Sequence, residues 1–402
     1  MLQRVFKAFQ YRDFRLMWIG ACTSTIGTWM QTVAQSWLVY TLSKDNPFFL
    51  GLDGFLGQIP IMLFSLLGGV LADRADRRTV LLGSQYVQMS CAFLLATLAY
   101  FHVVHVWQIL CLSFTVGMAQ SFGGPAYQAL IPSLVPRQDL PNAIALNSIQ
   151  FNLARIIGPV LGGLALAKLG ADWCFGLNGI SFVAVIISLY VIKVGFIPSK
   201  SSEAVLDSMK QGIGFIRMQE GMKPLIILSF LMTMLGIPLI TFLPVFAKEV
   251  LHGGTETFTR LLYCSGGGSV TGALIVAGLG KSKGQGRAAL LMLMVLGSAT
   301  IVFARSTSLA LSSAMMFLGG AAMITVFATI SSLVQAITED NMRGRVMSVY
   351  NVAFRGGMPV GMLIVGRLIP IYSAPLTMTV VGAMTILLGL YFLLVQRRIA
   401  QL

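Results

Sequence analysis

The chain has 402 residues, of which 56% are hydrophobic and only 10% are charged. A soluble domain carries about 25% charged residues, because its exterior must face water. A core cannot hide this much apolar surface, so the composition excludes a soluble protein and predicts that most of the chain lies in lipid. Since a spanning helix needs about 20 apolar residues, this length allows about twelve of them.

The net charge of +14 is unevenly distributed along the chain. Of the 28 Lys and Arg, 20 fall in loops on one side of the predicted spans and 6 on the other, while Arg155 and Arg355 lie inside apolar segments. This asymmetry follows the positive-inside rule and predicts that both termini are cytoplasmic. It argues against nucleic acid as the partner of the basic residues.

The apolar segments follow one another with short connections. We predict spanning helices at 14–42, 50–72, 80–101, 106–130, 142–167, 173–195, 224–247, 258–280, 288–304, 308–334, 346–369 and 375–395. The exception is the polar stretch 196–223, where Leu206, Met209, Ile213 and Ile216 recur at helical spacing. They indicate an amphipathic helix on the inner membrane surface, and a solvated linker is the alternative. We therefore predict six-helix bundles at 1–197 and 224–402, joined by a linker at 198–223.

The two halves carry matching residues. Three positions recur after an offset of 200, Ser148, Arg155 and Pro159 as Ser348, Arg355 and Pro359, and Asp139 recurs as Asp340. Several ordered matches at a nearly constant offset predict two parallel repeats, an architecture in which transporters bind substrate near the bilayer midplane.

Arg155 and Arg355 are the sharpest features of the repeats. Each lies about ten residues or more from the ends of its predicted helix, where an arginine is costly unless it is paired or hydrated. Asn152 shares a helix face with Arg155, as Asn351 does with Arg355. A role in substrate binding or gating is one interpretation. The other is structural, with each arginine bonded to carbonyls near Pro159 or Pro359.

Two short motifs resemble the major facilitator superfamily. Residues 69–81 read GVLADRADRRTVL, which is similar to the superfamily's loop signature except that Asp76 replaces a glycine. Residues 158–163 read GPVLGG, which resembles the core of an antiporter motif made by Gly158, Pro159, Gly162 and Gly163. The segments FRLMW at 14–18 and GTWMQTVA at 27–34 are similar to the enterobactin-exporter and macrolide-efflux branch.

The resemblance implies two pseudo-symmetric six-helix bundles in a plasma membrane, the inner membrane of a bacterium. It also implies proton-driven export of an amphiphilic small molecule by alternating access. The first and fourth helices then line the cavity, where Gln31, Gln35, Gln120 and Tyr127 suit an amphiphilic ligand. Hydrogen bonding between helices is the alternative role for these side chains.

The loop signature predicts a cytoplasmic gate of Gly69, Asp73, Arg74, Arg77 and Arg78. Asp73 ends a helix, where the dipole disfavours an anion, so it should seek a donor. The nearby arginines or the start of the eleventh helix are candidates for that donor. A charged loop that only obeys the positive-inside rule is the alternative.

Proton coupling needs a group that titrates, and Asp53 is the candidate, although an interfacial cap is an alternative role for it. Two mid-membrane arginines and few carboxylates predict an electropositive cavity and an anionic, siderophore-like or drug-like substrate. An uptake carrier or a lysolipid or lipid flippase on the same fold, and an intramembrane enzyme, are the alternatives. We expect no catalytic residues, cofactor or metal, and a monomer.

Overall fold

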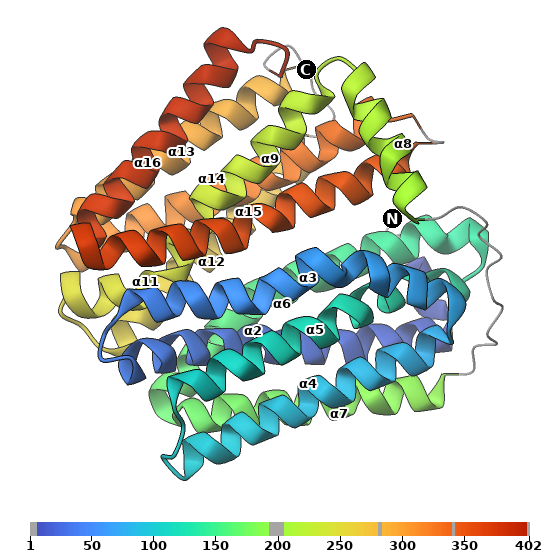
Figure 1. Ribbon diagram of the computed structural model, residues 1–402, viewed down its shortest axis with the longest axis horizontal. Helices are drawn as coiled ribbons and strands as arrows, with labels where there is room; N and C mark the ends of the chain where they lie inside the picture. The colour runs from blue at the N-terminus through green and yellow to red at the C-terminus, as the bar shows by residue number, and fades with distance from the viewer. Residues whose placement is uncertain (1–5, 193–204, 280–283, 340–341, 400–402) are drawn as a thin grey trace. The chain divides into compact units, whose positions relative to one another are not determined.

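The computed structural model describes residues 6–192, 205–279, 284–339 and 342–399, and within these ranges the chain forms helices and no strands (Figure 1). The side chains of residues 73, 205–209 and 277–279 also lie outside the description. The predicted all-α architecture is confirmed. Contacts divide the chain into two compact units, which are described in turn.

The first unit comprises Met1–Leu42 and Ile59–Ser202. Its helices, in chain order, are η1 (Lys7–Gln10), α2 (Arg12–Leu42), the second part of α3 (Pro47–Arg74), α4 (Arg77–Tyr100), α5 (Val106–Leu130), η2 (Ile131–Ser133), η3 (Arg137–Asp139), α6 (Leu140–Lys168) and α7 (Ala171–Val191).

The second unit comprises Ser43–Gln58 and Glu203–Leu402. It holds the first part of α3, followed by α8 (Val205–Met218), α9 (Met222–Gly236), α10 (Pro238–Thr241), α11 (Leu243–Val245), η4 (Phe246–Val250), α12 (Thr255–Leu279), α13 (Gln285–Arg305), α14 (Leu309–Ile337), α15 (Arg343–Tyr372), α16 (Ala374–Leu390) and η5 (Tyr391–Val395). The helix α3 is thus continuous but divided between the units, with Pro60 just beyond the division.

The spans agree with the count expected from the composition. Nine helical segments of the described ranges are long and apolar enough to cross a membrane. The helices α2, α5 and α12 are as long, at 31, 25 and 25 residues, and complete twelve. Two of these three less apolar helices, α2 and α5, carry the predicted ligand-binding residues Gln31, Gln35, Gln120 and Tyr127.

Glycines pack corresponding helices together in both units. A Cβ on Gly158 or Gly162 of α6 would collide with backbone atoms of α2, within 2.8 Å of the Ile26 and Met30 carbonyl oxygens respectively. A Cβ on Gly357 or Gly361 of α15 would collide in the same way with α9. Because α6 and α15 carry the repeated arginines, and α2 and α9 begin the two halves, this shared packing is what repeats require.

The amphipathic helix predicted in the linker is present as α8. It lies against the start of α15, where a Cβ on Gly212 would come within 2.8 Å of the Arg345 carbonyl oxygen. Ile216 is only 6% exposed, whereas Ile213 is 37% exposed. The side chains of Leu206 and Met209, the linker start at 198 and the repeat residue Asp340 lie outside the described residues. The division at 197 and 224 stays a prediction.

Candidate functional site

A chain of polar side chains connects α2, α5 and α7 in the first unit. Gln35 Nε2 donates to Ser113 Oγ at 2.9 Å, and Asn178 Nδ2 donates to Gln31 Oε1 at 2.6 Å. Gln31 Nε2 reaches Gln35 Oε1 at 3.4 Å, which joins the two pairs. Ser113 and Asn178 are buried, with 8% and 2% exposed. Both predicted glutamines therefore form hydrogen bonds to neighbouring helices, and their role in binding substrate stays a prediction.

Asn178 was missed by the sequence reasoning. It lies within a segment that the sequence predicts as an apolar span, and its sequence signal was an amide side chain inside that span. The hydrogen bond from Ser181 Oγ to the Asn178 carbonyl, at 2.7 Å, belongs to the same polar cluster. An amide in an apolar helix needs a partner from another helix, and the stripe of glutamines on α2 supplies it.

Tyr127 is also engaged inside the first unit. Its hydroxyl donates to Asn147 Oδ1 of α6 at 2.6 Å. Gln120, two turns earlier on α5, is exposed and has no hydrogen bond to any described residue. Of the two predicted α5 residues, Gln120 is the one whose amide remains open to a ligand.

The repeated arginines lie deep within their helices. Arg155 stands near the middle of the 29-residue α6, and Arg355 more than three turns inside the 30-residue α15. Arg155 is half-buried beside the fully buried Ala154, while Arg355 is exposed. Beside Arg355, the ring of Phe354 packs edge-on against Phe327 of α14 at 5.1 Å between centroids.

The asparagines that share faces with the arginines are exposed in both units. Asn152 Nδ2 donates to the Ser148 carbonyl oxygen one turn earlier, at 2.8 Å, and Asn351 is likewise exposed. Ser148 and Ser348 each bond a carbonyl four residues back, at 3.1 and 2.9 Å. In each unit, these polar residues therefore lie on an exposed part of their helix.

The arginines of the predicted gate bind helix ends. Arg77 donates to the carbonyl oxygens of Ala72 in α3 and Ala129 in α5, at 3.2 and 2.9 Å. Arg78 donates to the Tyr190 carbonyl oxygen of α7 at 3.0 Å, and its guanidinium lies 5.9 Å from the Tyr190 ring centroid. A cation at a helix C-terminus offsets the dipole and satisfies free carbonyls. These two arginines therefore stabilise three helix ends within the first unit.

The other gate residues have different surroundings. The side chain of Asp73 lies outside the described residues, and Arg74 is exposed. Asp76, the departure from the superfamily pattern, caps α4: its carboxylate accepts from the Arg78 amide at 3.1 Å and from Thr79 Oγ1 at 2.8 Å. The substitution thus replaces a glycine by a strong N-cap. A Cβ on Gly69 would meet no atom within 4 Å.

The antiporter-like motif forms the α2–α6 contact described above. Gly158, Gly162 and Gly163 are buried, and Pro159 lies between them inside α6. Within the first unit, their arrangement allows two backbones to approach closely, and this packing accounts for Gly158 and Gly162.

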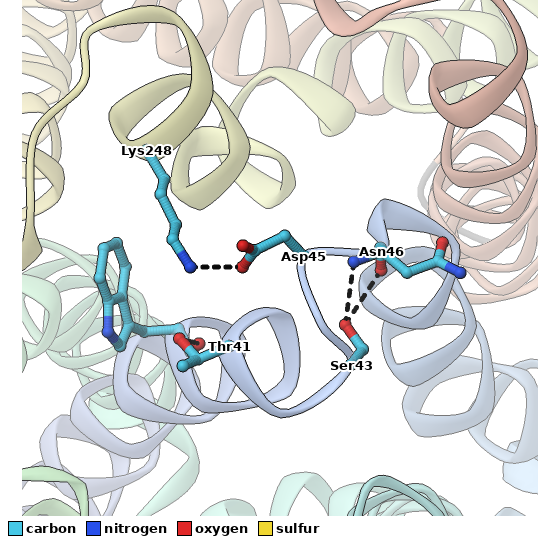
Figure 2. Close-up of polar contacts among 6 residues, drawn as sticks. Thr41, Ser43, Asp45, Asn46 and Lys248 are labelled. Atoms are coloured by element: carbon cyan, nitrogen blue, oxygen red, sulfur yellow. Dashed lines mark hydrogen bonds and ion pairs between the residues drawn. The ribbon is translucent and has the colours of Figure 1, made fainter.

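Asp53, the candidate for proton coupling, lies in the part of α3 that belongs to the second unit, where it is half-buried. This part packs against the rest of the second unit. Gly51 packs against Gly366 of α15, and Lys248 of η4 forms an ion pair with Asp45 at 2.5 Å, as Figure 2 shows. Lys44 and Asp45 both have left-handed backbone, with φ of 55° and 62°. The pair was not predicted, because it joins a loop to a residue 203 positions away.

A second cluster that the sequence reasoning missed surrounds Asp139 in the first unit. Its carboxylate is 3% exposed and accepts from Lys7 Nζ and Tyr11 Oη, both at 2.7 Å. The hydrogen bond that Lys7 donates to Asp139 raises the pKa of the Lys7 ammonium above its usual 10.5. Asn142 Oδ1 accepts from the Ala8 amide at 2.8 Å. Together they fasten η1 to the start of α6.

Comparison with known proteins identifies the architecture. The chain is 25% identical over 383 residues to the staphyloferrin A transporter of Staphylococcus aureus, covering 93% of this chain and 94% of that protein. It is 25% identical over 348 residues to the enterobactin exporter EntS of Shigella boydii, covering 82% and 79%. Among solved structures, it superposes on a POT family transporter in complex with 5-aminolevulinic acid, with a TM-score of 0.76, 12% identity and 96% of each chain covered.

The family profile described as transmembrane secretion effector matches residues 4–401, almost the whole chain. The predicted resemblance is confirmed, and the protein is a multi-pass membrane transporter rather than an enzyme. The chain belongs to the transmembrane secretion effector family of the major facilitator superfamily.

Proposed function

We propose that this protein is a secondary active transporter that exports an amphiphilic, anionic small molecule by alternating access, coupled to proton movement. The observation that carries the proposal is the pair Arg155 and Arg355, which stand at equivalent mid-helix positions of the two repeats. The transporter class follows from the family, and the substrate type, the direction of transport and the proton coupling are the proposed part.

The argument for an anionic substrate begins with Arg355. Its side chain is exposed although it lies in the interior of a spanning helix. A guanidinium that faced hydrocarbon at this depth would cost several kcal/mol, so we place it in a hydrated cavity instead. Five N–H donors in a fork suit a carboxylate or a catecholate better than a neutral ligand.

The surroundings of Arg355 supply the amphiphilic part of the proposed site. The half-buried ring of Phe354 stacks on the buried ring of Tyr350 at 5.8 Å between centroids, beside the exposed Asn351. Aromatic faces next to a few polar groups are typical of small-molecule sites. Two relatives are named for staphyloferrin A and for enterobactin, which supports a siderophore-like substrate.

The test is equilibrium binding of a panel of catecholate and carboxylate siderophores to purified protein. We expect Arg355→Ala to weaken the binding of an anionic ligand about 10- to 100-fold, since a hydrogen bond to a charged group contributes about 1.5–3 kcal/mol. Arg367→Ala is the matched control, because Arg367 is exposed on the same helix but nearer its end. Equal affinities for Arg355→Ala and Arg367→Ala would refute the anionic site.

Direction and coupling need flux measurements in proteoliposomes with an imposed pH gradient. Export of substrate against its own concentration gradient that requires the pH gradient supports the proposal. Asp53→Asn should remove this requirement if Asp53 carries the proton. Gradient-independent movement of lysolipid instead would favour a flippase, and substrate entry driven with protons would favour uptake.

The orientation and the boundaries of the repeats belong to the same proposal. We propose cytoplasmic termini and bundles at 1–197 and 224–402, as the charge asymmetry predicts. A cysteine placed in the loop at 101–105 should react with an impermeant maleimide from outside intact cells, and one at the C-terminus should not.

A further inference from the structure

A groove runs between the end of α4 and the start of α7 in the first unit. Its volume is about 300 Å³, and its walls include Phe93, Thr97, Tyr100, Phe101, Asp172 and Trp173. Gly176 and Leu177 also line it. A volume of this size is at the lower end of the range for small-ligand pockets.

The side chains around this groove face the surroundings of the protein. Tyr100, Phe101 and Trp173 are 66%, 65% and 55% exposed, and Ile180 is 60% exposed. Both α4 and α7 are membrane spans. Aromatic rings at the ends of spanning helices lie at the level of the lipid headgroups, so the groove opens where lipid is the surrounding medium.

One charged group lies among these aromatic walls. Asp172, in the first turn of α7, is half-buried and forms no hydrogen bond or ion pair with any residue that the structure describes. An acidic residue at a helix N-terminus is stabilised in its anionic form by the helix dipole. A carboxylate at the membrane interface without a protein cation can pair with a cation from its surroundings.

We propose that this groove is a binding site for a phospholipid with an ammonium headgroup, such as phosphatidylethanolamine. The ammonium pairs with Asp172, and the neighbouring rings of Tyr100 and Trp173 favour a cation by their quadrupoles. One acyl chain lies against the apolar side chains that line the groove beside Gly176. Because Asp172 is negatively charged, it attracts the ammonium headgroup and repels the headgroup of an anionic lipid.

Gly176 provides a way to close the groove without disturbing the fold. A Cβ at Gly176 would meet no atom within 4 Å, so a larger side chain extends into open space. Gly83 of α4 is exposed, lies outside the groove walls and also has no atom within 4 Å of its Cβ position. Gly176→Leu and Gly83→Leu are therefore matched substitutions that differ in whether they fill the groove.

The experiment is native mass spectrometry of the delipidated full chain, titrated with phosphatidylethanolamine and phosphatidylglycerol of identical acyl chains. We expect the wild type to bind phosphatidylethanolamine about two- to fivefold more tightly, the range of one partly exposed ion pair. Asp172→Asn should make the affinities for the two lipids equal, while a polar side chain remains in the first turn of α7. Gly176→Leu should bind one lipid fewer than Gly83→Leu.

The proposal fails if the wild type does not discriminate between the two lipids, or if Gly176→Leu and Gly83→Leu bind equal numbers. It also fails if dodecylamine alone binds in an Asp172-dependent manner and phosphatidylethanolamine does not, because the occupant is then a free amphiphile. A thermal-stability measurement on each variant checks that all four proteins are folded. Transport activity is not the readout, so the result is independent of the proposed substrate.

Discussion

The ion pair between Asp45 and Lys248 gives a quantitative prediction about the proposed alternating access. The pair and the contact of Gly51 with Gly366 attach the segment 43–58 to the second unit. The rest of α3 packs in the first unit. If this segment detaches from the second unit during transport, both attachments are released, so weakening the pair should favour release.

The expected size of the effect is small. Both side chains are 39% exposed, so water screens the pair, and a contribution of about 0.2–1 kcal/mol is appropriate. At the upper end, this changes the release equilibrium about fivefold, because about 1.4 kcal/mol corresponds to a factor of ten. Asp45→Asn is the right perturbation, since asparagine also tolerates the left-handed backbone at this position. Lys248→Met removes the other charge.

Burial of Leu50 provides the assay. Leu50 is the fourth residue of α3 and only 2% exposed, so a cysteine there is protected while the segment stays packed. In a background without the five native cysteines, we expect Leu50→Cys to react with an impermeant maleimide up to about fivefold faster when either charge is removed. The shared Leu50→Cys change cancels in every comparison.

Non-additivity is the decisive feature of this experiment. Once one charge is gone the pair no longer exists, so the double variant should react no faster than the single ones. Additive accelerations from Asp45→Asn and Lys248→Met would refute the reasoning, as would rates equal to the parent's.

Two further predictions concern packing and capping in the first unit. Gly158→Ala should lower thermal stability by about 1–3 kcal/mol, because the new methyl group collides with Trp29 and the Ile26 carbonyl, whereas Gly69→Ala, with open space, should not lower it. A neutral Gly158→Ala in a thermal unfolding assay would contradict the close packing of α2 and α6. Asp76→Ala should cost about 0.5–2 kcal/mol through the lost N-cap, and Asp76→Gly, which restores the superfamily residue, only a few tenths relative to Asp76. Equal midpoints for Asp76→Ala and the parent would show that the cap contributes nothing.

The spans and repeats could be predicted because they depend on properties that act locally. Length and apolarity alone select a spanning helix. The offset of 200 between Arg155 and Arg355 reflects two helices, α6 and α15, that pack closely on α2 and α9 respectively. The glycines at 158 and 162 were singled out through the antiporter-like motif, and the structure adds that they let α2 and α6 come close.

Partners across the fold were harder to predict. The sequence singled out Gln31 on α2, but its hydrogen-bond partner Asn178 lies 147 positions away and could not be predicted. Asp139 appeared only as a repeat match, and its carboxylate proves to bind Lys7 and Tyr11. In both cases, the sequence identifies a polar group in a costly place, and only the packing of distant helices says which donor satisfies it.

The division of α3 also has a mechanical consequence. The change from one unit to the other falls between Gln58 and Ile59, and Pro60 follows at once. Proline has no amide hydrogen and crowds the preceding turn, so the helix lacks one backbone hydrogen bond there and bends at low cost. A straight helix that is packed into both units would resist movement of one unit relative to the other. Because α3 bends easily beside this division, its two parts can change their angle while each stays packed in its own unit.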